Sequence, residues 1–410
     1  MLILQVLRWI LLAAEIWIAG PILYLCILSV SATLAAKKRN PENTHSLASS
    51  RLDFAILVPA HNEEAILGTL LESLSALEYP KDLYTVYVVA DNCTDRTAEL
   101  ARTSVWVRVY ERFDQAKHGK GYALNWLLQK LEEDQLTHDA YVILDADSVV
   151  VPTFLQSMAW ELAQGAQALQ ASNTVLNVAE SPYTALRWVA LTLMNHVRPL
   201  GRNGLGSSST LTGNGMCLSR TILKRYPWQS YALSEDYHYY LTLVGHGERV
   251  RYVPEAVVRS QMPTTFAQMR TQDIRWEPAG GSQPSWQIAL RLLGAGLRSR
   301  NFICIEAVAE LLTPPLSFLV CWCLFTLIAS LLMWSFPELL LSFLLIGGLI
   351  YYVGTALYLL HPPRAVYKAI VYAPGFVIWK LWIYFVLSRS KKYTSKWIRT
   401  DRTIYTKETI

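Results

Sequence analysis

Phe54-Ala-Ile-Leu-Val-Pro-Ala-His-Asn-Glu-Glu64 is an apolar run that ends abruptly in polar residues. Two later segments repeat this layout: Tyr84-Thr-Val-Tyr-Val-Val-Ala-Asp-Asn-Cys-Thr-Asp95 and Tyr141-Val-Ile-Leu-Asp-Ala-Asp147. Short apolar runs rich in β-branched residues predict strands that are buried on both faces of a parallel sheet. Patterns of helical period accompany them, over residues 63–77, 94–102 and 120–131. We therefore expect a doubly wound α/β domain, in which helices cross between parallel strands.

The polar residues after these three strands are of a consistent kind. Ligands of doubly wound domains bind at the carboxyl ends of the strands. Helix capping explains Thr94 or Asp95, but it does not explain carboxylates at three successive strand ends on one edge. The residues that we expect at this edge are Asn62, Glu63, Asp91, Asp145 and Asp147.

Asp145-Ala-Asp147 places alternate carboxylates where a loop can turn both toward one hard divalent cation, Mg²⁺ or Mn²⁺. An Asp-x-Asp pattern alone is common in proteins. Lys120 stands in Lys117-His-Gly-Lys-Gly-Tyr-Ala-Leu-Asn125, a Gly-rich helix start of the kind that binds phosphates. A solvated surface lysine is the simpler alternative. Together the two motifs suit a cation and a diphosphate group.

Two further motifs lie nearer the C-terminus. Ser234-Glu235-Asp236 supplies a pair of carboxylates suited to general-base chemistry, or else an acidic capped helix start. Gln272-Asp-Ile-Arg-Trp276 combines an amide, a guanidinium and an aromatic plane. These groups suit a sugar ring and a diphosphate, although an Arg-Trp pair also occurs in amphipathic packing.

Composition predicts that part of the chain lies in lipid. Of 410 residues, 52% are hydrophobic and 17% are charged, which is too apolar for an ordinary soluble enzyme. Residues 16–36 lack charge and precede Lys37-Lys38-Arg39, which predicts a membrane anchor whose C-terminal end is cytoplasmic. A cleaved signal peptide fits less well, because the run exceeds the usual length. Residues 316–334 and 339–360 predict a transmembrane hairpin.

Two apolar segments are ambiguous. Residues 365–387 contain Lys368, Lys380 and Pro374-Gly375, and a span there would place the basic tail outside. We therefore expect an interfacial or re-entrant helix. Residues 285–300 fit an interfacial helix and a core helix with a solvated side equally well. The basic residues gather beside apolar stretches, which argues against a nucleic-acid partner, and six scattered cysteines indicate a reducing compartment.

The ordered set Asp91, Asp145-x-Asp147, Ser234-Glu235-Asp236 and Gln272-x-x-Arg275-Trp276 resembles the membrane-bound processive branch of glycosyltransferase family 2. Cellulose, hyaluronan and poly-N-acetylglucosamine synthases form that branch, and ceramide glucosyltransferases share much of the pattern. The resemblance covers residues 54–276, the flanking apolar segments and Trp397-Ile-Arg-Thr-Asp-Arg402. It implies a Rossmann-like catalytic domain of GT-A type, inserted between transmembrane or interfacial helices.

The resemblance also implies roles for individual residues. The predicted nucleotide-sugar site contains Asp91, Asp145, Lys120, Asn62 and Glu63. The metal ligands are Asp147 and Asp145, and the general base is Asp236, with Glu235 as its neighbour in the motif. The acceptor and diphosphate side contains Gln272, Arg275, Trp276 and the tight loop Gly213-Asn214-Gly215. The chain departs from many relatives where Glu277-Pro-Ala-Gly-Gly281 replaces a Gly-Arg pair.

The sequence therefore predicts a metal-dependent inverting transferase that moves sugar from a UDP-sugar to a growing extracellular polysaccharide. Transfer of one sugar to a lipid such as diacylglycerol or ceramide is the alternative, and an inactive scaffold fits poorly because every expected carboxylate is present. Homo-oligomers and secretion partners are compatible with this class. We expect an integral protein of a bacterial-type plasma membrane with these parts: an anchor (1–40), a cytoplasmic catalytic domain (50–280), an interfacial segment (281–310), a hairpin (311–362) and an interfacial or re-entrant helix with a basic tail (363–410).

Overall fold

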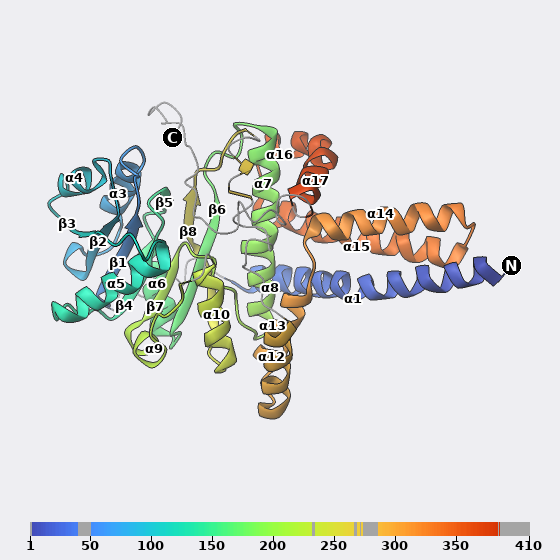
Figure 1. The fold of residues 1–410 in the computed structure, drawn as a ribbon, viewed down its shortest axis with the longest axis horizontal. Coiled ribbons are helices and arrows are strands. Elements are labelled where there is room, and N and C mark those ends of the chain that lie inside the picture. Colours follow the sequence, from blue (N-terminus) through green and yellow to red (C-terminus); the bar gives the residue numbers. More distant parts are fainter. Residues whose placement is uncertain are drawn as a thin grey trace.

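The computed structural model describes residues 2–39, 51–231, 234–265, 269–270, 272–273, 286–383 and 385. Arg275, Trp276, the segment after them and the basic tail lie outside these residues, so the predictions made for them stay predictions. Figure 1 shows an α/β domain at one end of the molecule and three long helices, α1, α14 and α15, that extend from it side by side.

An eight-stranded mixed sheet forms the α/β domain, with the order β3-β2-β1-β4-β7-β6-β8-β5. Strands β3, β2, β1 and β4 are parallel, as predicted for the three apolar runs. Strand β7 is antiparallel to both of its neighbours, so the second half of the sheet is not a simple continuation. The strands are β1 (Phe54–Ala60), β2 (Tyr84–Asp91), β3 (Val107–Arg112), β4 (Ala140–Ile143), β5 (Ser148–Val150), β6 (Ala168–Val175), β7 (Met216–Ser219) and β8 (Val250–Ser260).

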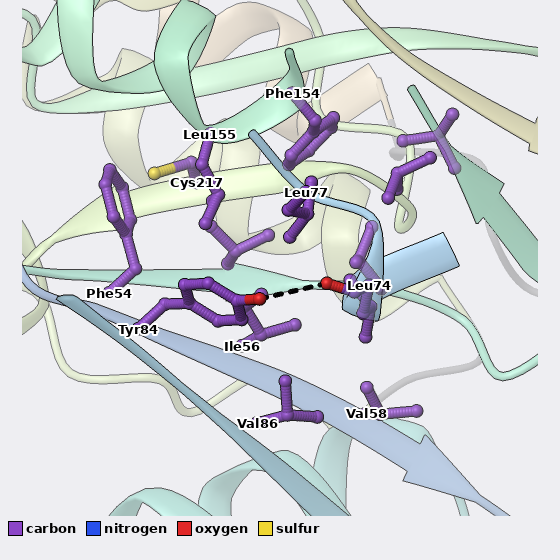
Figure 2. Close-up of a cluster of buried hydrophobic side chains, with 14 of the residues drawn as sticks. Phe54, Ile56, Val58, Leu74, Leu77, Tyr84, Val86, Phe154, Leu155 and Cys217 are labelled. Carbon is purple, nitrogen blue, oxygen red and sulfur yellow. Dashed lines mark hydrogen bonds between the residues drawn. The ribbon is translucent and has the colours of Figure 1, made fainter. Parts of the chain in front are cut away.

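Helices cover both faces of the sheet, which explains why β1 is apolar at almost every position. Phe54, Ile56 and Val58 face one core, where they pack with Leu74 of α3 and Phe154 of α6 (Figure 2). Residues between them in β1 join a second core with helix α5. The helices of this half are α3 (Leu67–Ser75), α4 (Thr97–Arg102), α5 (Lys120–Glu133) and α6 (Phe154–Ala163).

The first predicted helix begins later than its sequence pattern suggests. Residues 63–66 form a turn in which the carbonyl of Glu63 accepts hydrogen bonds from the backbone amides of Ile66 and Leu67, at 3.1 and 3.0 Å. Helix α3 starts only at Leu67. The polar residues after β1 therefore stay in a loop at the carboxyl edge of the sheet.

A second group of helices covers the part of the sheet formed by β6 and β8. Helix α7 continues through a π-helical turn, η2, into α8, and Figure 1 shows this long rod between the sheet and the extended helices. The elements are α7 (Pro182–Thr192), η2 (Leu193–Val197), α8 (Arg198–Gly204), α9 (Arg220–Arg225), α10 (Glu235–Gly245), α12 (Trp286–Ser299) and α13 (Phe302–Leu312).

Helices α1 (Leu2–Lys38), α14 (Leu316–Leu332) and α15 (Phe336–Leu360) pack through a shared apolar core that includes Ile22, Leu345 and Leu349. Among the described residues, two helical stretches are long and apolar enough to cross a membrane: Gln5–Lys38 and Phe336–Leu360. Helices α13 and α14 together form a third stretch if their 62° bend lies within one span. Both arms of the predicted hairpin are thus long helices, and their placement in a bilayer stays a prediction.

Polar contacts of α1 join this bundle to the catalytic domain. Arg202 of α8 is bidentate to Glu306 of α13, with distances of 2.7 and 2.8 Å, and Tyr24 of α1 donates to the same carboxylate. Arg39, at the end of α1, binds Glu255 at 2.7 Å in a part-buried pair. Removing Glu306 would leave the buried charge of Arg202 without its carboxylate, so this contact strongly favours one orientation of α8, α13 and α1.

The two ambiguous segments have distinct structures. Helix α12 buries Ala289 and Leu292 in the core of the catalytic domain and exposes Trp286, Leu290 and Leu297 on another side. It therefore has a core face and an exposed apolar face. Residues 364–382 form three short pieces instead of one long helix: α16 (Arg364–Ala369), η4 (Ile370–Tyr372) and α17 (Ala373–Trp382).

Candidate active site

Four of the predicted site residues meet at the carboxyl edge of the sheet. Lys120 is the first residue of α5, and its ammonium group binds Asp145 Oδ1 and the carbonyl of Gly213, each at 2.5 Å. A Cβ atom added to Gly213 would lie 3.0 Å from Asp236 Oδ2 and 3.6 Å from Lys120 Nζ. Segments that are distant in sequence thus bring a cation, two carboxylates and the backbone of a glycine together.

The Gly213-Asn214-Gly215 loop is held by its central residue. Asn214 Oδ1 accepts from the backbone amide of Asp145 at 3.1 Å, and its side-chain amide donates to Ser148 and Ser260 at 2.8 and 3.0 Å. Both glycines have positive φ, +78° and +72°, which side chains with a Cβ rarely adopt. The loop therefore fixes the backbone at Asp145, and its first glycine lies directly against Asp236.

Glu235 and Asp236 occupy the first turn of α10, where Asp236 Oδ1 accepts from the backbone amide of Tyr237 at 2.8 Å. Ser234 makes no side-chain capping bond, so the alternative of an ordinary capped helix start is not supported. A Cβ added to Gly121 would lie 2.2 Å from the carbonyl oxygen of Ser230 and 3.3 Å from the Cβ of Glu235. The absence of a side chain on Gly121 thus lets the start of α5 pack against the Ser230 backbone, close to Glu235.

Burial controls the electrostatics of this pair. It raises the pKa of Glu235 above the usual range, and the adjacent charge of Asp236 adds to the rise while Lys120 opposes it. Burial likewise raises the pKa of Asp236, again against the effect of Lys120. Burial alone would lower the pKa of Lys120, but the charges of Asp145, Glu235 and Asp236 raise it above its ordinary value. The lysine therefore stays charged, and the carboxyl pair binds protons more readily than free carboxyls.

Asp91 lies buried at the end of β2, where Arg112 at the end of β3 donates to its Oδ1 at 2.5 Å. Burial raises the pKa of Asp91, and Arg112 lowers it in opposition. Arg112 also donates to the carbonyl of Lys117 at 2.8 Å, so it joins Asp91 to the loop before α5. Sequence reasoning missed Arg112, because an arginine at the end of a half-exposed strand carries no signal of its partner.

Asn62 and Glu63 brace the loops after β1 and β2. Asn62 has a positive φ of 56°, and its Oδ1 accepts from the backbone amide of Thr94 at 2.7 Å. The backbone amide of Glu63 donates to Thr97 Oγ1 at 2.8 Å. The described contacts of both residues thus hold the edge of the site in shape, and their contact with a nucleotide stays a prediction.

Asp147 lies in the turn between β4 and β5, which the backbone amide of Ser148 closes by donating to the carbonyl of Asp145 at 3.2 Å. Within the described ranges, no group of three or more His, Cys, Asp or Glu side chains is placed to hold a metal ion. A magnesium-type cation usually takes one or two carboxylates, and phosphate oxygens and water complete its shell. That Asp145 and Asp147 hold a cation together with a diphosphate therefore stays a prediction.

The Gln272 segment makes its described contacts elsewhere. Gln272 is 2% exposed, and its Oε1 has no hydrogen-bond partner among the described residues. Asp273 is fully buried and binds Arg187 of α7 and Lys380 of α17. The structure therefore brings Lys120, Asp145, Gly213 and Asp236 together, and it joins the Gln272 segment to α7 and α17.

Comparison with known proteins agrees with this arrangement. Residues 51–279, more than half of the chain, match the family model described as "Glycosyltransferase like family 2". The probable glycosyltransferase YdaM of Bacillus subtilis is 26% identical over 242 residues, which cover 56% of this chain and 55% of that protein. The β-monoglucosyldiacylglycerol synthase of Nostoc sp. is 30% identical over 236 residues, which cover 55% and 48%. The chain spans about half the length of these curated relatives.

The same fold occurs in a solved structure, the mannosyltransferase PcManGT from Pyrobaculum calidifontis in complex with GDP-Man and Mn²⁺. The TM-score is 0.55 at 16% sequence identity, and the match covers 93% of this chain and 96% of that one. This likeness confirms the predicted GT-A type α/β fold. The family match, over more than half of the chain, establishes that this chain belongs to glycosyltransferase family 2.

Proposed function

We propose that this protein transfers one sugar from a nucleoside-diphosphate sugar, with UDP as the expected nucleotide, to a lipid acceptor that enters from the membrane. The observation that carries the reaction is the cluster of Lys120, Asp145, Gly213 and Asp236. It brings a cation for the diphosphate, a carboxylate for a metal and a carboxylate for proton transfer together around Gly213.

The arrangement supports an inverting displacement. Lys120 would bind the diphosphate, and Asp145 and Asp147 would hold a divalent cation, Mg²⁺ or Mn²⁺, whose chemistry is to neutralise charge on the leaving group. Asp236 accepts the proton from the acceptor hydroxyl while the oxygen of that hydroxyl forms a bond to the anomeric carbon. The bond from that carbon to the diphosphate oxygen breaks, and the nucleoside diphosphate leaves with the electron pair. The mannosyltransferase of the same fold holds GDP-Man and Mn²⁺, which supports the donor class and the metal.

Two observations favour a lipid acceptor over a growing polysaccharide. Several relatives are named as β-monoglucosyldiacylglycerol synthases. In addition, α1, α14 and α15 pack on one another largely through apolar side chains such as Ile22 and Leu349, with one buried polar cluster of Glu15, Thr326 and Ser342. A bundle of apolar helices beside the catalytic domain suits an acceptor that already lies in the bilayer.

We also propose that the catalytic domain lies on the cytoplasmic side. Lys37 and Lys38 are exposed at the end of α1 that joins this domain, and Lys and Arg are enriched on the cytoplasmic side of spans. Labelling of introduced cysteines in intact cells tests this side. An impermeant reagent that labels a surface cysteine in the catalytic domain would contradict it.

The function is tested with the purified protein in phospholipid vesicles that contain diacylglycerol or ceramide. Radiolabelled UDP-sugars and GDP-mannose are supplied in turn, with Mg²⁺ or Mn²⁺. We expect a chloroform-soluble product that carries one sugar. A water-soluble chain of many sugars would replace the lipid acceptor with a polysaccharide, and the absence of any transfer from every donor would refute the proposed reaction.

A further inference from the structure

Asp273 stands inside the predicted acceptor segment, one residue after Gln272, yet its partners come from the C-terminal part of the chain. Lys380 Nζ binds Asp273 Oδ1 at 3.0 Å, and Trp379 Nε1 donates to Oδ2 at 3.2 Å. Arg187 of α7 pairs with the same carboxylate. Asp273 is 0% exposed, so α7 and α17 together enclose it.

A second contact joins the same two segments. The guanidinium of Arg270 lies over the ring of Trp382, 5.9 Å from its centre. Trp379, Lys380 and Trp382 belong to one turn of α17, and Arg270 and Asp273 lie three residues apart. One face of α17 is therefore matched to the stretch that leads into the Gln272 motif.

The rest of α17 and its neighbours present apolar side chains outward. Ile378 is 67% exposed, and Val371 and Tyr372 are also exposed. These residues are continuous with a segment that packs on α7 through Val366 and Phe376. Exposed apolar groups beside helices that are long enough to span a bilayer suit the lipid surface. Lys380, one of the charges that argue against a span over residues 365–387, thus has the buried carboxylate of Asp273 as its partner.

Charge balance makes this contact sensitive. Asp273 faces two cations, Arg187 and Lys380, so loss of its carboxylate would remove a counter-charge that both share. Burial alone would raise the pKa of Asp273, but Arg187 and Lys380 lower it below the ordinary value. The aspartate is therefore charged in the folded protein, and α17 is held by a charged bond and not by apolar packing alone.

We propose that Asp273 is a positioning residue through which the seating of α17 at the lipid surface sets the position of Gln272, the residue that the sequence predicts on the acceptor side. The inference rests on the proposed function. Its consequence is that α17 controls transfer to the acceptor and leaves donor binding at the Lys120 cluster unchanged. A shift of about 1 Å in a positioning group can cost about 10²-fold in rate.

Three variants separate this role from general stability. Lys380→Met keeps the apolar stem and removes the charge, Lys380→Arg keeps the charge, and Ile378→Glu puts a charge on the exposed face of α17. Lys368→Met is the matched control, because Lys368 lies in the same C-terminal segment and is exposed. We expect Lys380→Met and Ile378→Glu to lower kcat for lipid transfer by about ten- to a hundredfold, with donor affinity changed less than about twofold. Lys380→Arg should recover most of the rate, and Lys368→Met should match the wild type.

A readout that needs no turnover keeps the inference separate from the proposed function. Hydrogen exchange of peptides that cover residues 269–273, measured in vesicles, should be faster in Lys380→Met and Ile378→Glu than in Lys368→Met. Unchanged exchange together with wild-type transfer in both variants would refute the positioning role while leaving the proposed function intact. Faster exchange in a protein whose wild type transfers no sugar would support the link between α17 and Asp273 and refute the proposed reaction alone.

Discussion

Replacement of Asp236 by asparagine changes one atom at the centre of the proposed reaction. Asp236 Oδ1 accepts from the backbone amide of Tyr237 at 2.8 Å, and an amide oxygen can keep that bond. Oδ2 of Asp236 lies on the side of Gly213 and Lys120. In the variant the amide NH₂ takes the place of Oδ2, and this group cannot accept a proton. The shape of the site is therefore preserved and the base is lost.

The size of the effect follows from the contacts that remain. A general base contributes about 10²–10⁴-fold in rate, which equals about 3–5 kcal/mol of transition-state stabilisation. Lys120 is held by hydrogen bonds to Asp145 and to the carbonyl of Gly213, so the substitution leaves its ammonium group in place. We expect the Asp236→Asn variant to transfer sugar at least about a hundredfold more slowly, with donor affinity nearly unchanged.

Transfer rates in vesicles and donor affinities from equilibrium dialysis should be measured for Asp236→Asn beside Glu235→Gln. Loss of turnover in Glu235→Gln with normal turnover in Asp236→Asn would make Glu235 the base. If neither variant changed the rate, the assignment of α10 to catalysis would be wrong.

Three further predictions concern the metal, the buried carboxyl pair and the loop. Excess chelator should abolish transfer and added Mg²⁺ or Mn²⁺ restore it, and Asp147→Asn should weaken metal-dependent donor binding in dialysis; full activity in chelator would remove the metal from the reaction. Burial raises the pKa of Glu235 in the folded protein. The protonated side chain therefore favours the folded state fully at pH values below the unfolded-state pKa of about 4.3, and this contribution is lost as the pH rises through the folded-state pKa. Glu235→Gln should therefore raise Tm more at pH 8 than at pH 5, and an equal change at both values would contradict the shift. Gly215→Ala places a Cβ 2.6 Å from the Cβ of Ala171 at a φ of +72°, and it should lower the free energy of unfolding by about 2–5 kcal/mol. The control Gly165→Ala has a φ of +85° but lies in open space, so it should cost about 1–2 kcal/mol. Equal denaturant midpoints for the two variants would refute the packing argument.

The sequence by itself determined the parallel half of the sheet and the long helices. Strands β1, β2 and β4 are buried on both faces, so each leaves an uninterrupted apolar run that can be read without a structure. Helices α1 and α15 can be predicted in the same way, because their length and low charge indicate spans. Asp145 and Asp236 could be chosen as candidate site residues, because one follows such a strand and the other opens a helix.

The tertiary structure alone decided the partners of these groups. Arg112 pairs with Asp91, which lies 21 residues away in the sequence, and Lys380 pairs with Asp273, which lies 107 residues away. Any carboxylate can pair with any cation, so pairing carries no periodic signal in a chain; it depends on which segments the fold brings together. The antiparallel insertion of β7 and the late start of α3 at Leu67 have the same origin. Hydrogen bonds between distant segments, rather than local propensity, set strand order and helix limits there.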